Sequence, residues 1–416
     1  MSSAAHTTSL ASRGPQLVSK PDRLVAIDMF RGIAMILMAL DHARDYFTHL
    51  RFPPELLSQT YLALFFTRWV THYCAPGFVF LAGTGAYLSL SRGKTPAQLS
   101  HFLLTRGIWL MVLEVTVVHF AWTFTTNFLF GQVIWALGLS MIIMAGLVRL
   151  PMWAITTFGF VTVFGHNLLD GIKADSLGGW SWLWHVLHQP GLILRNGQPI
   201  FMIAYPLIPW VGVMTLGYAF GALMRQDAAI RRRQAFMIGA AALALFVVLR
   251  ATNLYGNPSA DVPGRAALGV GGFTVQATAE KTLISFLNVA KYPPSLQFLL
   301  MTLGPALMLI SLFDRVNLGR APWRWAVVFG RVPLFYYLAH LFLIHLLAVA
   351  AAMAFGQPYE WLLKGAFVLN RIPTGYGHNL PFIYLIWLTA VVLLYFPCRW
   401  FAEVKRRRRD WWLGYL

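Results

Sequence analysis

The chain has 416 residues, of which 58% are hydrophobic and 12% are charged, and its formal net charge is +18. A soluble domain carries about twice that charged fraction, so the composition excludes one and indicates a polytopic membrane protein. Unbroken apolar runs of about 20 residues favour membrane-spanning helices over barrel strands, which alternate over about 10 residues. Lys and Arg in cytoplasmic loops can account for the positive charge, so we predict no nucleic-acid partner.

Residues 1–20 are polar, rich in Ser and without the apolar core of a signal peptide, and we expect them to form a disordered cytoplasmic tail. Residues 21–402 should form one all-α transmembrane domain, and residues 403–416 a basic cytoplasmic tail able to contact anionic lipid. Hydropathy predicts about ten spans, the second of which is long enough to break near Pro76 and Gly77. The predicted ranges are 24–47, 61–90, 104–126, 128–148, 151–169, 202–224, 234–251, 294–314, 326–351 and 380–402.

The distribution of Lys and Arg between the spans predicts their orientation. An even number of spans places both termini on the same side of the membrane. The connections after the even-numbered spans are rich in Lys and Arg, whereas those after spans one and three contain only Arg51. Both termini should therefore be cytoplasmic. The long connections at 170–201, 252–293 and 352–379 should fold into a lid or rim over a site that faces outward.

The first predicted span is unusually rich in charge. It reads RLVAIDMFRGIAMILMALDHARD over residues 23–45, and positions 28, 31, 35, 38, 42 and 45 share one helix face. A charge in a span costs about 3 kcal/mol or more, so we expect this face to line a protein-enclosed cavity. Asp28 and Arg31 can form an ion pair near one end, where Arg31 could also bind a phosphate. Packing between helices is the alternative role for this pair.

His42 is the candidate general base at the other end of this face, able to take a proton from an attacking hydroxyl or amine. Asp41 is its neighbour in sequence and points about 100° away, so it is not expected to orient His42. Asp45 is better aligned. The alternative is structural, with Asp41 and Arg44 forming a salt bridge at the membrane interface.

A second histidine candidate lies in the second predicted span. His72 is part of THYCAPGFVFLAGTGAYLSL. We expect Gly77, Gly83 and Gly85 of this stretch to allow close helix packing, because small residues let backbones approach. His72 itself is a candidate site residue.

Two later spans also contain ionisable side chains. Glu114 should be neutral or paired, either as part of a proton relay or with a buried arginine such as Arg31 or Arg331. His340 and His345 are five residues apart, so at most one of them should reach the cavity. A helical two-histidine metal site needs a spacing of four, and we predict no metal.

Several longer stretches are similar to one known family. They are RLVAIDMFRGIAMILMALDHARDYF, THYCAPGFVFLAGTGAYL, GQVIWALGLSMI, YPLIPWVGVMTLGYAFG, KYPPSLQFLLMTLGPAL and FGRVPLFYYLAHLFLIHL. From about residue 20 to 400, the chain resembles bacterial proteins with a heparan-alpha-glucosaminide N-acetyltransferase catalytic domain. The resemblance implies a multi-pass acyltransferase of the bacterial inner membrane. Such enzymes move an acyl group from cytoplasmic acyl-CoA, typically acetyl-CoA, to a sugar amine or hydroxyl on the far side.

The resemblance also suggests roles for individual residues. His42 falls where related O-acyltransferases hold a first-helix histidine, and Arg31 falls on their arginine. The lysosomal branch has Asn at the position of His42 and a catalytic histidine in the loop before the second span, where His49 and His72 are the nearest histidines here. Acyl transfer is therefore supported, whereas heparan as the acceptor is not. The predicted assignments are His42, Asp41, Asp28 and His72 as catalytic, Arg31 and Arg331 as binding acyl-CoA, and Asp45, Glu114 and His340 as binding the acceptor.

The implied partners are acyl-CoA as co-substrate, an unidentified glycan or small-molecule acceptor, and the lipid bilayer, and a homodimer is compatible with them. Our hypothesis is direct transfer, in which His42 deprotonates the acceptor. One rival is a proton-coupled transporter of a small polar solute that uses Asp28, Arg31, Asp41 and His42 as its binding site. Another is a lipid-binding or partner-binding scaffold without turnover.

Overall fold

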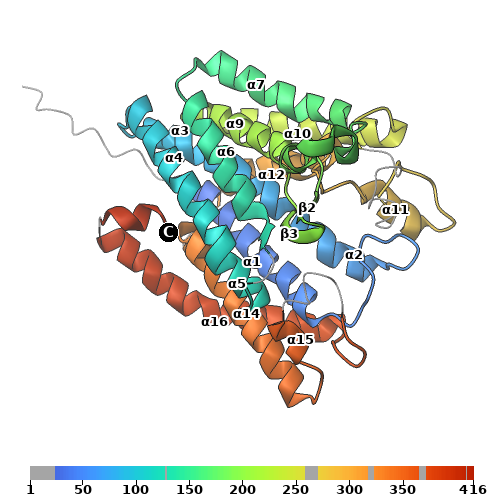
Figure 1. Ribbon diagram of the computed structural model, residues 1–416. Coiled ribbons are helices and arrows are strands. Elements are labelled where there is room, and N and C mark those ends of the chain that lie inside the picture. The colour runs from blue at the N-terminus through green and yellow to red at the C-terminus, as the bar shows by residue number, and fades with distance from the viewer. Residues whose placement is uncertain (1–23, 127–128, 258–269, 317–322, 365–371, 409) are drawn as a thin grey trace, which may run out of the picture.

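The computed structural model describes residues 24–126, 129–257, 270–316, 323–364, 372–408 and 410–416. Over these residues the protein is mostly helical, which confirms the predicted fold class (Figure 1). The tail predicted at residues 1–20 lies outside the described residues.

Most of the helices follow the apolar runs of the sequence. The α-helices are α1 Val25–Phe47, α2 Leu62–Trp69, α3 Cys74–Leu90, α4 Pro96–Leu113, α5 His119–Thr123, α6 Val133–Leu147, α7 Met152–Gly165, α8 Ser181–Leu187, α9 Leu207–Leu223, α10 Ala228–Thr252, α11 Ala279–Leu287, α12 Leu296–Phe313, α13 Trp323–Arg331, α14 Pro333–Ala354, α15 Glu360–Leu363 and α16 Leu380–Arg407. Short 3₁₀ turns are η1 Val70–Tyr73, η3 His166–Leu169, η4 Ala174–Trp180 and η7 Trp411–Gly414, and η2 Glu114–Val118 is a π-helical turn.

Seven helical segments of the described chain are long and apolar enough to cross a membrane. They are Leu62–Leu90, Pro96–Thr123, Met152–Leu169, Ala228–Thr252, Leu296–Phe313, Pro333–Ala354 and Leu380–Arg407. The three other predicted spans correspond to α1, which is charged, and to the shorter apolar helices α6 and α9. A polytopic membrane protein is thus confirmed, while ten crossings and cytoplasmic termini stay predictions.

The second predicted span is broken, as its length suggested, but one turn before the predicted place. The 3₁₀ turn η1 separates α2 from α3, and Pro76 lies in the first turn of α3. Proline is tolerated there because the first amides of a helix have no carbonyl partner within it. The break places His72 in η1, beside the end of α1 that carries His42.

Helix α1 lies at the centre of the molecule, between α3 and α12 on one side and α14 and α16 on the other (Figure 1). Its charges are therefore surrounded by protein rather than lipid, as a charged stripe in a membrane protein requires. The crossing of α1 and α13 is very close: a Cβ at Gly330 would lie 1.8 Å from the carbonyl oxygen of Asp28. This crossing fixes the position of Arg31, which donates to the Gly330 carbonyl oxygen at 3.3 Å.

The described parts of the long connections are folded, as predicted. Strand β3 (Gln198–Ile203) pairs in parallel with β1 (Leu129–Gly131) and antiparallel with β2 (Gly191–Arg195). Helices α11 and α15 belong to the other two connections. These elements lie around the C-terminal end of α1 (Figure 1).

Candidate active site

A polar cavity of about 380 Å³ opens at the C-terminal end of α1. Two of the three connections predicted to form a rim contribute to its lining, through Lys291 of 252–293 and Ile372 of 352–379. Its charged and histidine lining residues are Asp41, His42, Arg44, Asp45, Arg51, Glu55, Arg68, His72 and Lys291. We call this space the polar cavity.

A network of ion pairs forms one wall of the polar cavity. Arg68 donates to a carboxylate oxygen of Asp41, and its Nε lies 2.7 Å from Oε1 of Glu55. Arg44 pairs with Asp41 at 3.0 Å and also with Asp45. This is the Asp41–Arg44 salt bridge that we gave as the structural alternative to a catalytic role. Buried charges of this kind are stable only when they are paired, so the carboxylate of Asp41 serves to hold the two arginines.

Glu55 lies in the connection between α1 and α2. Burial by itself would raise the pKa of Glu55. The positive charge of Arg68, the interaction with His72 and the charge of Arg44 together outweigh burial and hold this pKa well below its usual range. Tyr292 is also in a connection and lines the cavity. Burial would raise the pKa of its phenol, whereas the charges of Lys291 and Arg68 lower it below the ordinary value. The cavity wall is therefore strongly charged at neutral pH.

His42 faces the polar cavity and is joined to a second histidine behind it. Its Nδ1 lies 2.7 Å from Nε2 of His340, and its ring meets the edge of Trp122 with 4.7 Å between centroids. His340 is fully buried on α14, and its Nδ1 lies 2.9 Å from the carbonyl oxygen of Tyr336. His340 does not itself line the cavity. Its contact with His42 differs from the acceptor-binding role that we predicted for it.

The neighbouring histidines have different surroundings. Both ring nitrogens of His345 hydrogen-bond to backbone carbonyl oxygens, those of Ala121 and Leu362. This agrees with the expectation that at most one of His340 and His345 reaches the cavity. His72 lines the polar cavity, is 1% exposed, and has its Nε2 3.9 Å from Oε1 of Glu55. His72 thus lies in the same cavity as His42.

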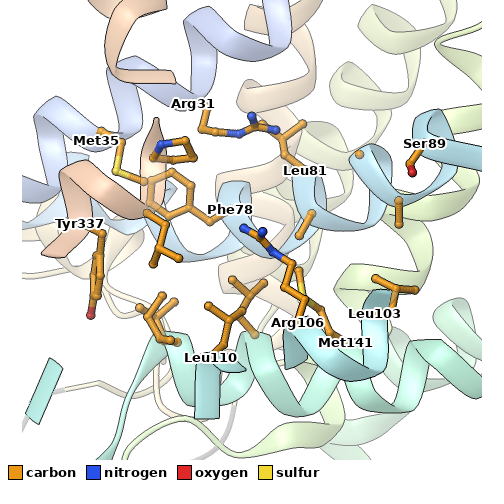
Figure 2. Close-up of a pocket in the computed structure, with 18 of the residues that line it drawn as sticks. Arg31, Met35, Phe78, Leu81, Ser89, Leu103, Arg106, Leu110, Met141 and Tyr337 are labelled. Carbon is orange, nitrogen blue, oxygen red and sulfur yellow. The ribbon is translucent and has the colours of Figure 1, made fainter. Parts of the chain in front are cut away.

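Two further spaces lie toward the N-terminal end of α1. An apolar pocket of about 240 Å³ is lined by Met35 and Met38 of α1 and by residues of α3, α4, α6 and α14. Figure 2 shows Arg31 and Arg106 on opposite walls of this pocket, with Tyr337 at one end and Ser89 at the other.

The second space, which we call the basic cleft, has a volume of about 590 Å³ and adjoins the apolar pocket. The two share Arg31, Gly85, Arg106 and Pro333. Six basic side chains line the cleft: Arg31, Arg92, Arg106, Arg331, Lys405 and Arg406. A positively charged opening thus leads into an apolar pocket.

Asp28 and Arg31 lie at this cleft and form the predicted ion pair, at 3.6 Å. Asp28 is about 21 Å along α1 from His42, at 1.5 Å per residue, so the two cannot contact the same reacting atoms. Among the glycines of α3, the predicted close packing is confirmed for Gly77 and Gly83. A Cβ there would lie 2.7 Å from the Phe30 ring and 1.9 Å from the Met214 carbonyl oxygen, respectively. A Cβ at Gly85 would meet no atom within 4 Å, because Gly85 faces the pocket.

Of the alternatives predicted for Glu114, the pair with a buried arginine is wrong within the described chain. Its Oε1 accepts a hydrogen bond from the backbone amide of Gln132 at 2.8 Å, and neither Arg31 nor Arg331 pairs with it. Gln132 follows strand β1 and lines the polar cavity. Glu114 therefore supports the cavity wall through the backbone, and one of its two oxygens is hydrogen-bonded without a cation.

Sequence reasoning missed several residues of these spaces. Arg68 and Glu55 complete the ion network, Lys291 and Tyr292 line the polar cavity, and Arg106 lines the pocket. A signal existed for Arg68, a lone charge within the apolar stretch LALFFTRWVTHY. Glu55, Lys291 and Tyr292 lie in connections, and Arg106 lies near the start of the predicted span 104–126, where a basic residue is ordinary. Within the described residues, no group of three His, Cys, Asp or Glu side chains is placed to hold a metal ion.

A comparison with models of known protein families assigns the chain to a family. The family model described as heparan-alpha-glucosaminide N-acetyltransferase, catalytic, matches residues 23–254, which is more than half of the chain. No curated protein matches the chain. The matched range includes His42, Arg68 and Arg106, whereas Lys291 and His340 lie beyond it.

Proposed function

Since the chain belongs to the heparan-alpha-glucosaminide N-acetyltransferase catalytic family, we propose that it transfers an acyl group, acetyl in the simplest case, from acyl-CoA to an amine or hydroxyl of a polar acceptor. The observation that carries this proposal is the position of His42. It faces a polar cavity on one side, while an apolar pocket with a basic opening reaches α1 from the other end.

The basic cleft and the apolar pocket suit an acyl-CoA. Arginine and lysine bind phosphate oxygens through charge-assisted hydrogen bonds, and six such side chains line the cleft. The adjoining pocket is lined mainly by apolar side chains and could hold the acyl-bearing arm. Arg31 and Arg106 line both spaces, so we expect them to lie where the phosphate groups of the bound acyl-CoA end and its acyl-bearing arm begins. Bound acyl-CoA would supply the thioester whose acyl group is transferred.

The polar cavity suits the acceptor. His42 would take the proton from the acceptor nitrogen or oxygen as this atom attacks the acyl carbonyl. Arg44, Arg68 and their acidic partners offer a fixed set of charged groups, and the ion pairs hold them in place. Asp45 and His72 lie in the same cavity and are proposed to contact the acceptor. If both termini are cytoplasmic, the cleft opens to the cytoplasm of a bacterial cell and the acceptor binds on the outer side.

The test uses the full-length protein purified in detergent, with acetyl-CoA and a set of amino sugars and neutral sugars. Release of the CoA thiol and acetylation of the sugar are measured for wild type, His42→Ala and His42→Gln. His101→Ala, an exposed histidine of α4, is the matched control. We expect both His42 variants to lose at least about 100-fold in rate, because a general base contributes about 10²- to 10⁴-fold.

Acetyl-CoA should also raise the melting temperature of wild type and of His42→Ala alike, because a ligand that binds the native state stabilises it. Full activity in His42→Ala would refute the role of His42. Absence of any stabilisation and of thiol release, together with solute uptake into sealed vesicles, would favour a transporter instead.

A further inference from the structure

We propose that His340 is a positioning residue that fixes the tautomer of His42, so that the basic nitrogen of His42 is Nε2 and Nδ1 carries the hydrogen. This inference rests on the proposed function and assigns His340 a role within it. The observation behind it is a chain of two hydrogen bonds, from His42 Nδ1 to His340 Nε2 at 2.7 Å and from His340 Nδ1 to the Tyr336 carbonyl oxygen at 2.9 Å.

The direction of these bonds follows from the last acceptor. A backbone carbonyl oxygen can only accept, so Nδ1 of His340 must carry a hydrogen. In a neutral His340, Nε2 is then an acceptor, and the hydrogen between the two rings belongs to Nδ1 of His42. A neutral His42 therefore has its lone pair on Nε2. If Nδ1 of His42 carried no hydrogen, it would face Nε2 of a neutral His340 as a second acceptor. The alternative is a hydrogen on both nitrogens of His340, which makes it a fully buried imidazolium, and both arrangements are costly.

The rings have the orientation that such a bond needs and little freedom to leave it. The planes of His42 and His340 differ by 12°, with 4.9 Å between centroids, as expected for an N–H···N bond in the plane of both rings. The ring of Tyr336 lies 5.3 Å from that of His340, and Trp122 packs edge-on against His42 at 4.7 Å. His340 is fully buried. The pair is therefore held in one arrangement before substrate binds.

This arrangement gives a balanced proton transfer. The acceptor nitrogen or oxygen bonds to the acyl carbon, the carbon–sulfur bond breaks, and the acceptor proton moves to Nε2 of His42. The resulting imidazolium keeps its Nδ1 bond to His340 and returns the Nε2 proton to the thiolate. In the serine protease triad the orienting group is a carboxylate. Here it is a neutral ring, and the charged groups around His42 are Asp41, Arg44 and Lys291.

The functional test compares His340→Met with His340→Gln. Methionine removes the acceptor, so His42 can adopt either tautomer, and we expect kcat to fall about 100-fold with KM for the acceptor nearly unchanged. Glutamine can present a carbonyl oxygen near the former Nε2 position, and we expect it to restore most of kcat. The matched control is His345→Met, a fully buried histidine of the same helix whose bonds go only to backbone.

A second readout does not depend on turnover. In protein labelled with ¹⁵N at histidine, the signal missing from His42→Gln identifies His42, and its two nitrogens report which one carries the hydrogen. We expect the Nδ1–H form in wild type and in His340→Gln, and a shift toward Nε2–H in His340→Met. The inference is overturned if wild-type His42 is Nε2–H. It is also overturned if His340→Met keeps wild-type kcat and pH profile while His42→Ala is inactive. Activity in His42→Ala would instead refute the proposed function.

Discussion

Replacing Arg68 by Met should strongly destabilise the protein at neutral pH. Among the described side chains, Glu55 has two basic partners within 4 Å, Arg68 and His72, and the substitution removes Arg68. It also removes one of the two arginines that pair with Asp41. The side chains of Arg68 and Asp41 are each 11% exposed, so water compensates them poorly. Removing one partner of such a buried pair costs about 3–5 kcal/mol.

The pH dependence of this loss has a defined sign. The pKa of Glu55 is lowered in the folded wild type, so its contribution to stability is present above the unfolded pKa of about 4.3 and is lost as pH falls toward the folded value. In Arg68→Met, Glu55 is buried without that cation and its pKa should rise above the ordinary value. Acidification from about pH 7 to about pH 5 should therefore narrow the difference from wild type.

Unfolding in mixed micelles with increasing SDS, followed by tryptophan fluorescence at both pH values, measures these differences. Adding Glu55→Gln to Arg68→Met should recover part of the loss, because it removes the unpaired carboxylate. Arg407→Met, at an exposed ion pair, should leave the midpoint unchanged. An Arg68→Met protein as stable as wild type at pH 7, or one whose deficit grows on acidification, would refute the reasoning.

Three further substitutions test other parts of the molecule. Gly85→Leu should fill the apolar pocket and abolish stabilisation by acetyl-CoA without lowering the melting temperature of the free protein. The control is Gly146→Leu, where a Cβ also meets no atom within 4 Å, and it should change neither the stabilisation nor the melting temperature. Normal acetyl-CoA binding by Gly85→Leu would contradict the donor site. Arg106→Ala should raise KM about tenfold for acetyl-CoA but not for acetyl-pantetheine, which lacks the nucleotide phosphates; an equal change for both would show that Arg106 does not bind those phosphates. Arg250→Met removes bonds to the backbone carbonyls of four residues, three of which lie three to six positions before Lys291 in the same connection. It should lower both stability and acceptor affinity by more than Arg407→Met does, as unfolding and saturation curves would reveal.

Local spacing allowed much of the α1 site to be predicted from the sequence. Ion pairs three residues apart on one helix, such as Asp28–Arg31 and Asp41–Arg44, follow from helix geometry alone. The contact between His42 and His340 joins residues 298 positions apart. It depends on how α1 and α14 pack, which no periodicity encodes.

The error at Glu114 has a different physical origin. One of the predicted alternatives gave this buried side chain a cation, but its Oε1 accepts a hydrogen bond from the backbone amide of Gln132 instead. Which amides are free to do so depends on where strands and turns form. The position of these amides depends on the tertiary structure, and so does the position of Lys291 in the same cavity as the end of α1. Neither position could be derived from the order of charges along the chain.

The polar cavity and the apolar pocket share no lining residue, and this separation has an electrical consequence. In the proposed reaction one proton and one acyl group pass between the polar cavity and the apolar pocket in opposite directions. The two substrates and the two products are neutral at the reacting atoms, so turnover carries no net current. In proteoliposomes, wild type should hold a potential imposed with potassium and valinomycin throughout turnover. Trp122→Ala, which removes the ring that lines the polar cavity and packs against His42, should dissipate it. Collapse of the potential by the wild-type protein would show that a conducting path joins the two sides.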